Sequence, residues 1–312
     1  MSGDQSIRFF EWQESRDDRR LSKLLDAAFA VEKYTLSFPH IFTANSSAQI
    51  LVACDKNNSI VAACTVDTEI WSSPRFLRGA CIGSVAVAPD RQRQGFGKAL
   101  LRNVLAKLQA DKCHDFAYLF SDQHEFYGSL GFKAAGREKL YSHRAGHVSG
   151  SSGERFIAPT KTSELSAGQA KHIWQALERF RKPCESHASL GKLEMVLKIP
   201  DMLVCGFETA QGEWTAGAFI GKGVDFSGVV HSFFAKDDST LKRMWSCFTA
   251  HAAERSVELQ VAPGAWSSGL KNDLSETHQQ ALCMVRPLTE AADGVCDLID
   301  SCQLYPRSLF SS

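Results

Sequence analysis

The sequence lacks the features that mark several large classes of protein. No apolar run reaches about 18 residues, the length that a helix needs to cross a bilayer, and the first residues, Met1 to Gln5, begin no signal peptide. The ten cysteines include no C-x-x-C pair, and most lie in apolar, strand-like segments where a reduced thiol acts as a small hydrophobic group. We therefore expect a reduced, cytoplasmic protein without a structural metal site, a disulfide framework or a membrane span.

The chain also lacks a charge imbalance. Its 312 residues carry 35 basic and 35 acidic side chains, so the formal net charge is zero. A nucleic-acid partner or an anionic membrane surface usually requires a basic protein face, and we expect neither partner here. The hydrophobic content of 44% is ordinary for a globular protein, and the length is sufficient for two domains that each bury a core.

The most informative stretch covers residues 81–101 and predicts a strand, a short loop and a helix. Pro89 ends the strand because it cannot donate to a ladder, and the helix has an apolar stripe that starts at Leu101. The loop between them, residues 92–97, reads Gln-Arg-Gln-Gly-Phe-Gly. Its glycines let the backbone approach a ligand, and the first N–H groups of a helix have no partner within the helix. Together with the basic side chains, these groups predict a phosphate site.

This loop lacks the third glycine of a dinucleotide-binding fingerprint, because Leu100 occupies that place, and it lacks the Gly-Lys-Ser/Thr of a Walker loop. It resembles instead the (Arg/Gln)-x-x-Gly-x-(Gly/Ala) pyrophosphate loop of the GCN5-related N-acetyltransferases (GNAT), here Gln92-x-x-Gly95-x-Gly97 after a Val-x-Val-x-Pro strand. About thirty residues later, Phe126-Tyr127-Gly128-Ser129-Leu130-Gly131-Phe132 resembles the F-Y-x-x-x-G-F segment of the same family. Two independent motifs make the resemblance specific.

The order of predicted elements agrees with the topology of that family. A first strand, a helix at 17–30 and a three-stranded meander lead into the loop and its helix. A strand at 116–120 is expected to lie parallel beside the strand before the loop, and a short helix and a strand pair within 132–142 follow it. We expect an α+β fold, an α/β sandwich, in which helices flank a mixed, mainly antiparallel sheet.

The second half of the chain predicts a degenerate copy of the same fold. Residues 149–153, Ser-Gly-Ser-Ser-Gly, have the composition of a linker, so we expect a catalytic domain at 1–148 and a second domain at 154–312. Where the phosphate loop should recur, residues 236–240 read Lys-Asp-Asp-Ser-Thr. This segment lacks glycine, and its two carboxylates would repel a pyrophosphate, so we expect it not to bind coenzyme A. The last stretch, residues 291–312, carries no motif.

The GNAT resemblance implies acetyl-CoA as the cosubstrate and no metal. The amides of the loop and of the first helical turn would hold the diphosphate, and the backbone of the preceding strand would pair with the pantetheine arm where two parallel strands move apart. Gly83, within that strand, suggests a bulge or a close approach there. The residues assigned to the cofactor are Val85, Ala86, Val87, Gln92, Arg93, Gln94, Gly95, Phe96, Gly97 and Lys98.

Tyr127 is the predicted general acid. A phenol has a reference pKa of about 10, so it is protonated at neutral pH and can donate to a departing thiolate, as the tyrosine at this place does in the family. The general base is less defined, because residues 80–88 contain no carboxylate where many family members have a glutamate. Glu69 can equally lie on a solvated strand face, and Glu125 can equally cap a helix. Besides a water relay or an amine that arrives neutral, the open alternatives are Asp67, Glu69, His124 and Glu125.

We expect an N-acetyltransferase that moves the acetyl group of acetyl-CoA to a primary amine by direct attack in a ternary complex. A small-molecule acceptor is favoured by analogy, because two-copy members of the family include enzymes that act on thiol-cofactor precursors and on aminoglycosides. One alternative is a protein or peptide amine, which an open groove around Trp71 and Tyr34 would favour. The other is a non-catalytic acyl-CoA-binding sensor that keeps the loop and has lost its base.

Overall fold

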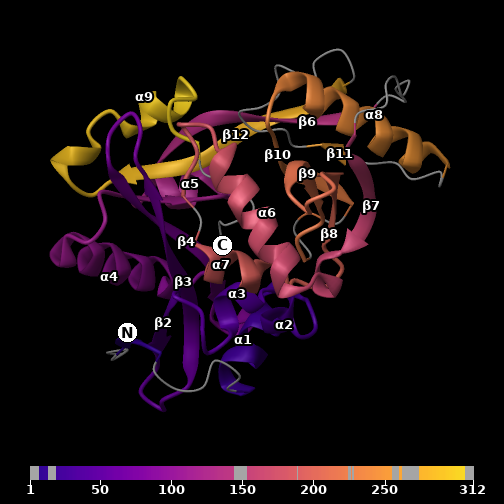
Figure 1. Ribbon diagram of the computed structural model, residues 1–312. Helices are drawn as coiled ribbons and strands as arrows, with labels where there is room; N and C mark the ends of the chain where they lie inside the picture. Colours follow the sequence, from indigo (N-terminus) through magenta and orange to yellow (C-terminus); the bar gives the residue numbers. More distant parts are fainter. Residues whose placement is uncertain are drawn as a thin grey trace. The chain divides into compact units, whose positions relative to one another are not determined.

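The computed structural model shows two compact units, each made of separate stretches of the sequence (Figure 1). Unit 1 contains Met1–Gly136 and Leu282–Ser301, and unit 2 contains Arg137–Ala281 and Cys302–Phe310. None of the described helices has the length and apolarity that a bilayer crossing requires. The residues that the structure describes are 7–12, 19–143, 153–187, 189–223, 226, 228–254, 260–261 and 274–305.

Unit 1 is built on a mixed sheet. β1, β2, β3 and β4 pair antiparallel in sequence order, β5 pairs parallel with β4, and β12 pairs antiparallel with β5. The strands are β1 (Arg8–Glu11), β2 (Gln49–Cys54), β3 (Ile60–Trp71), β4 (Leu77–Val87), β5 (Phe116–Leu119) and β12 (Leu274–Pro287). The helices are α1 (Arg19–Phe29), α2 (Tyr34–Ser37), α3 (Pro39–Phe42), α4 (Phe96–Asp111), α5 (His124–Gly128) and α9 (Val295–Asp300), with 3₁₀ turns at Pro89–Arg91 and Glu290–Ala292.

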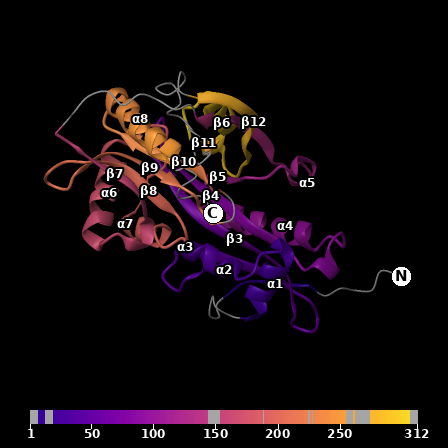
Figure 2. The same ribbon diagram turned by 90° about the vertical axis from the view of Figure 1, so that its right-hand side faces the viewer.

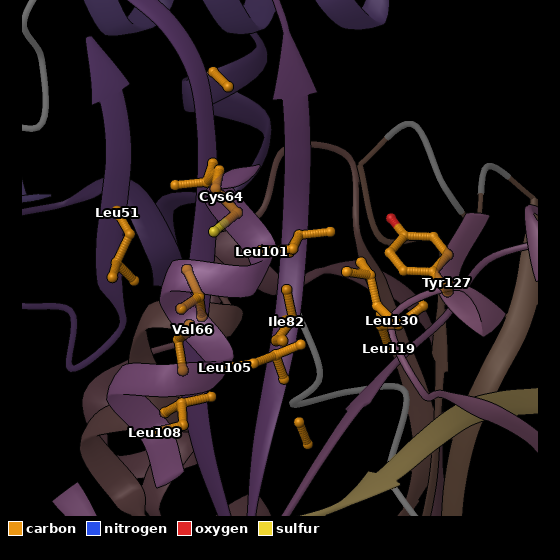
Figure 3. Packing of buried hydrophobic residues seen from close by; sticks show 14 of the residues in the cluster. Leu51, Cys64, Val66, Ile82, Leu101, Leu105, Leu108, Leu119, Tyr127 and Leu130 are labelled. Atoms are coloured by element: carbon orange, nitrogen blue, oxygen red, sulfur yellow. The ribbon is translucent and has the colours of Figure 1, made fainter. Parts of the chain in front are cut away.

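Helices cover both faces of this sheet. On one face, α4 packs its apolar stripe against alternate residues of the central strands, and Figure 3 shows Leu101 near Cys64 and Leu105 near Ile82. On the other face, α1, α2 and α3 enclose a second core that includes Ala63 and Ala86, and Figure 2 shows α1 and α4 on different sides of β3. Because successive residues of a strand point to opposite faces, burial on both faces explains why β2 and the first part of β3, Ile60–Cys64, are almost continuously apolar.

Unit 2 repeats this order of strands. β7, β8, β9 and β10 form an antiparallel meander, β11 pairs parallel with β10, and the end of β6 pairs antiparallel with β11. Helix α8 packs on one face, and α6 and α7 pack on the other. The predicted α+β fold in two tandem copies is therefore confirmed. The strands are β6 (Lys133–His143), β7 (Arg155–Lys161), β8 (Leu203–Glu208), β9 (Trp214–Ile220), β10 (Val229–Ala235) and β11 (Gln260–Val261), and the helices are α6 (Ala167–Arg179), α7 (Leu190–Val196) and α8 (Asp238–Glu254), with a 3₁₀ turn at Thr162–Glu164.

The strand that completes each unit comes from the other half of the sequence. In unit 1, residues 284–287 of β12 lie in register with residues 119–116 of β5, and in unit 2 the end of β6 lies beside β11. The compact units therefore differ from the contiguous domains 1–148 and 154–312 that the sequence predicts, and residues 149–152 of the predicted linker lie outside the described residues. Apolar patterning indicates that a segment is a strand, but it does not specify which free sheet edge the strand joins.

Residues 132–142 form one strand, β6, instead of the predicted pair. In the sequence, Gly136 resembles a turn signal, and its φ of +69° is one that glycine adopts readily. In the structure, however, it allows the C-terminal segment to approach the backbone of β6 closely. A Cβ at Gly136 would lie 2.9 Å from Leu282 Cβ and 2.9 Å from Ile299 Cγ2, so only glycine admits the C-terminal segment here. The Gly136 amide also donates to the Asp300 carboxylate at 2.6 Å.

Gly79 in β4 makes room for three aromatic rings, and replacing it tests the packing of unit 1. A Cβ there would lie 2.8 Å from Phe116 Cζ, 2.8 Å from Trp71 Cζ3 and 3.0 Å from Tyr118 Cε1, all of them buried groups. We expect Gly79→Ala to destabilise the protein by about 1–3 kcal/mol, because the rings must move off their favoured rotamers. Gly128→Ala is the control, since a Cβ at Gly128 meets no atom within 4 Å. Equal melting temperatures of the two variants would contradict this account.

Candidate active site

The predicted phosphate loop lies between β4 and α4. After the turn at Pro89–Arg91, the chain reverses direction through two residues with positive φ, Arg93 at +60° and Gly95 at +88°. The first hydrogen bond of the helix runs from the Ala99 amide to the Gly95 carbonyl at 2.9 Å. The N–H groups of residues 96–98 therefore precede the helical ladder and point out of the start of a 16-residue helix, which favours an anion in front of them.

Two predicted cofactor residues have a structural role in this loop. The Gln94 side-chain amide donates to the Asp90 carbonyl at 3.0 Å, and the Gln92 amide donates to the Val87 carbonyl at 3.5 Å. Gln92 therefore links the loop to the end of β4, and Gln94 links it to the turn at Pro89–Arg91. Arg91 lies 3.5 Å from a carboxylate oxygen of Asp90, which offsets part of its charge. Arg93 is exposed and Lys98 is half-buried, so these are the cations at the mouth of the loop.

The two glycines of the loop serve different purposes. A Cβ at Gly97 would lie 3.1 Å from Val87 Cγ2 and 3.7 Å from Phe126 Cζ, so Gly97 permits the close packing of α4 against β4. A Cβ at Gly95 would meet no atom within 4 Å, but the φ of +88° is one that residues with a side chain rarely adopt. Gly95 therefore provides the left-handed turn and leaves open space in front of the amides.

β4 and β5 move apart next to this loop. Their parallel pairing is confined to Gly79–Cys81 opposite Phe116–Tyr118, whereas β4 continues to Val87. β4 also contains a bulge, because the step from Gly83 to Ala86 lies opposite the shorter step from Ala63 to Thr65 on β3. Ser84, within the bulge, has a φ of +47°. The bulge expected near Gly83 is present, and the backbone of residues 82–87 on the side of β5 extends beyond the end of that strand.

Tyr127 lies at the edge of the core on the α4 face (Figure 3). Its side chain is held edge-on against Phe126 and Phe132, with ring centroids at 4.9 Å and 6.0 Å, and the residue is only 8% exposed. The pKa of Tyr127 is raised to about 12, mainly by burial and also by the Cys64 thiol nearby, while a hydrogen bond with Ser121 acts in the opposite direction. The phenol therefore holds its proton throughout the neutral range.

The four candidate bases fall into two pairs. Asp67 and Glu69 on β3 are each 2% exposed, so the alternative expectation that Glu69 lies on a solvated face is wrong. They alternate with Cys64 and Val66 of the α4 face and therefore point to the opposite face from Tyr127. His124 and Glu125 are exposed on α5. Helix α5 starts after Gln123 without a side-chain cap, so Glu125 is not the capping partner that the sequence suggests.

Unit 2 differs at the corresponding helix start. A carboxylate oxygen of Asp237 accepts a hydrogen bond from the Thr240 amide at 2.7 Å, at the beginning of α8. This backbone hydrogen bond is the main reason why the pKa of Asp237 lies below its ordinary value. The nearby cations Lys236 and Arg243 both pair with Glu154. The helix start in unit 2 is therefore occupied by the protein's own carboxylate, whereas in unit 1 it is open.

The described residues contain no group of three or more histidine, cysteine, aspartate or glutamate side chains that could hold a metal ion. The site thus consists of backbone amides, one exposed and one half-buried cation, a strand that parts from its neighbour and one buried phenol.

Residues 46–134 match the model of the acetyltransferase (GNAT) domain family. The match includes both the loop at 92–97 and the segment at 126–132. A search of curated proteins finds no matching sequence. The region from β2 to the start of β6 is therefore similar to a GNAT domain.

Solved structures extend this similarity to most of the chain. A probable N-acyltransferase of Enterococcus faecalis V583 superposes with a TM-score of 0.70 and 14% identity over 91% of this chain and 73% of that one. A GCN5-related N-acetyltransferase of Anabaena variabilis ATCC 29413 superposes with a TM-score of 0.66 and 12% identity over 90% of this chain and 73% of that one. A tandem GNAT protein from the clavulanic acid biosynthesis pathway superposes with a TM-score of 0.59 and 10% identity over 91% of this chain and 99% of that one. These likenesses show that most of the chain has the fold of such tandem acetyltransferases.

Sequence reasoning missed the C-terminal part of unit 1. Residues 282–287, Leu-Cys-Met-Val-Arg-Pro, form the strand beside β5, and Met284 belongs to the same apolar cluster as Tyr127. The apolar run before Pro287 is a strand signal that could have been found. Its partner could not, because more than 160 residues separate Met284 from Leu119 in the sequence.

Gly95→Asp is expected to abolish acetyl-CoA binding while the fold survives, because a carboxylate would then stand before the open amides of α4. Gly95→Asn is the matched control, since asparagine has the same shape, tolerates positive φ and carries no charge. We expect the asparagine variant to bind more weakly than the wild type but more tightly than the aspartate variant. Calorimetry should give one equivalent of acetyl-CoA per wild-type chain. A full equivalent bound to Gly95→Asp would place the cofactor elsewhere.

Proposed function

We propose that the protein transfers the acetyl group of acetyl-CoA to a primary amine of a small molecule, with the reaction in unit 1. The observation that carries the proposal is the combination of open amides at the start of α4 with a buried, protonated phenol on the neighbouring α5. Both flank the region where β4 parts from β5. A phosphate-containing thioester could therefore be held at one end and protonated at the other.

The residues of the loop fit coenzyme A. The open space at Gly95 admits a diphosphate close to the amides of residues 96–98, and Arg93 and Lys98 supply positive charge at its rim. The extended backbone of Val85, Ala86 and Val87 offers N–H and C=O groups to an arm that pairs like an added strand. The half-buried side chains of Val85 and Val87 pack on the α4 core, so only their backbone is assigned to the cofactor.

In the proposed mechanism, the neutral amine attacks the thioester carbonyl, a C–N bond forms and the C–S bond breaks. Tyr127 donates its proton to the departing thiolate, and the amine loses a proton to a base or to water. A pKa of about 12 matches the first task, because the phenol is almost fully protonated at physiological pH. Asp67 and Glu69 on the opposite sheet face are the buried candidates for the second task.

The burial of two aromatic residues favours a small acceptor over a protein. An open groove lined by Trp71 and Tyr34 would have suited a peptide, but Trp71 is 0% and Tyr34 is 6% exposed. Trp71 packs against Phe116 and Tyr118 at centroid distances of 5.5 Å and 6.0 Å, as a core residue does. Neither ring is therefore available as the wall of an open, shallow groove.

The proposed acceptor class is tested by release of free thiol from acetyl-CoA in the presence of different amines. The panel contains an aminoglycoside, a polyamine, a cysteine-derived amine, a lysine peptide and a peptide with a free N-terminus. We expect turnover with at least one small amine and none with the peptides. Turnover with peptides alone would favour a protein acceptor. Tight acetyl-CoA binding without turnover for any amine would favour the acyl-CoA sensor.

Tyr127→Phe tests the acid. Phenylalanine keeps the ring packing against Phe126 and Phe132 and removes only the hydroxyl, so we expect turnover to fall by about 10²–10⁴-fold while acetyl-CoA affinity changes less than about threefold. The raised pKa also predicts that the wild-type rate does not decline through Tyr127 ionisation below about pH 10, because the phenol is still protonated there. Equal rates for the two proteins would remove Tyr127 from the mechanism.

A further inference from the structure

The C-terminal strand of unit 1 brings an arginine to the turn that follows Tyr127. Arg286 on β12 lies opposite Ala117 of β5. Its guanidinium donates from Nη1 to the Leu130 carbonyl at 2.5 Å, although 156 residues separate the two in the sequence. Its side chain also lies against Gly131, where an added Cβ would be 3.6 Å from Arg286 Cδ and Nε. One cationic side chain thus contacts two consecutive residues of the F-Y-x-x-x-G-F segment.

The turn that Arg286 contacts, residues 127–132, is closed by hydrogen bonds to the backbone of Tyr127. The Tyr127 carbonyl accepts hydrogen bonds from the Leu130 amide at 2.9 Å and from the Phe132 amide at 3.2 Å. Gly131 closes the turn with a φ of +86°. A displacement of Leu130 or Gly131 would therefore act directly on the backbone that carries the phenol. The ring contact between Tyr127 and Phe132 couples the two ends of the turn a second time.

Arg286 is itself held in place by the pairing of its strand. Residues 284–287 pair with β5, and the Asp115 carbonyl accepts from both the Leu288 amide at 2.9 Å and the Thr289 amide at 3.1 Å. Met284, two residues earlier on the same strand, is buried in the cluster that contains Tyr127. Pairing and burial therefore hold this part of β12 against β5, and the Arg286 side chain extends from it to the turn.

We propose that Arg286 is a positioning residue for catalysis, which fixes the 127–132 turn and thereby orients the Tyr127 hydroxyl. The inference rests on the proposed function, since it assigns Arg286 a role through the acid of that reaction. A guanidinium bonded to a carbonyl near the end of a helix is a charge-assisted hydrogen bond in a favourable direction of the backbone dipole. Without it, the turn keeps its own hydrogen bonds and its apolar packing but loses its hydrogen bond to β12.

The test compares two arginines that both tie residues 282–301 to the rest of unit 1. Arg286→Met should lower kcat by about 10–100-fold and leave the KM for acetyl-CoA within about twofold, because a small misplacement of a reacting group is costly whereas the binding loop is untouched. Arg75→Met is the matched control, since Arg75 donates to the Asp293 carbonyl at 2.6 Å, away from Tyr127. We expect its kcat to equal that of the wild type. Arg286→Lys, which can still donate to one carbonyl, should recover most of the lost rate.

A double variant separates positioning from stability. If Arg286 acts through Tyr127, adding Arg286→Met to Tyr127→Phe should lower kcat by less than about twofold further, whereas independent effects would multiply. A multiplied loss, or a wild-type kcat in Arg286→Met, would overturn the inference while leaving the proposed function intact.

Hydrogen exchange provides a readout that does not depend on activity. The Leu130 and Phe132 amides should exchange faster in Arg286→Met than in Arg75→Met, because the turn is less restrained. Unchanged exchange would overturn the inference. If the wild-type protein acetylates no amine, the proposed function fails, and faster exchange in Arg286→Met would still show that Arg286 holds the turn without a catalytic consequence.

Discussion

The hydrogen bonding of one short strand determines where the candidate site of unit 1 lies. β5 has only four residues, and its two edges have different neighbours, β4 on one side and β12 on the other. Pairing with β4 stops at Cys81, so the rest of β4 departs from β5 and stays paired with β3 alone among the described strands. Pairing with β12 runs along the whole strand. The first arrangement makes the gap beside the phosphate loop, and the second brings Arg286 to the turn after Tyr127.

The binding loop and the general acid of the proposed reaction depend on different physical effects. The loop relies on backbone amides that precede the ladder of α4, and these cost nothing to orient because the helix itself holds them. The acid relies on burial, which keeps the Tyr127 proton in place at neutral pH. Asp67 and Glu69 lie on the other face of the same sheet from Tyr127.

The two units differ in the first turn of the helix that follows the fourth strand of each meander. In unit 1, Gly95 leaves the amides of α4 open. In unit 2, the Asp237 carboxylate accepts from the Thr240 amide and takes the place that an external anion would need. The glutamate that pairs with Lys236 and Arg243 then neutralises the remaining positive charge. The start of α8 is satisfied by an internal carboxylate, and the proposed function assigns the start of α4 to the diphosphate of a ligand.

The sequence alone determined the local features of this protein: the strand–loop–helix around Gly95, the tyrosine segment, the repeated element order and the missing loop of the second copy. These follow from neighbouring residues, because turn chemistry, helix starts and apolar periodicity act over a few positions. Only the tertiary structure decided the burial of Glu69, the hydrogen bond from Gln94 to Asp90, and the pairing of β12 with β5 and of β6 with β11. Those outcomes depend on which free edge a strand joins and on what covers a side chain. Residues far apart in the chain, such as Leu130 and Arg286, settle both.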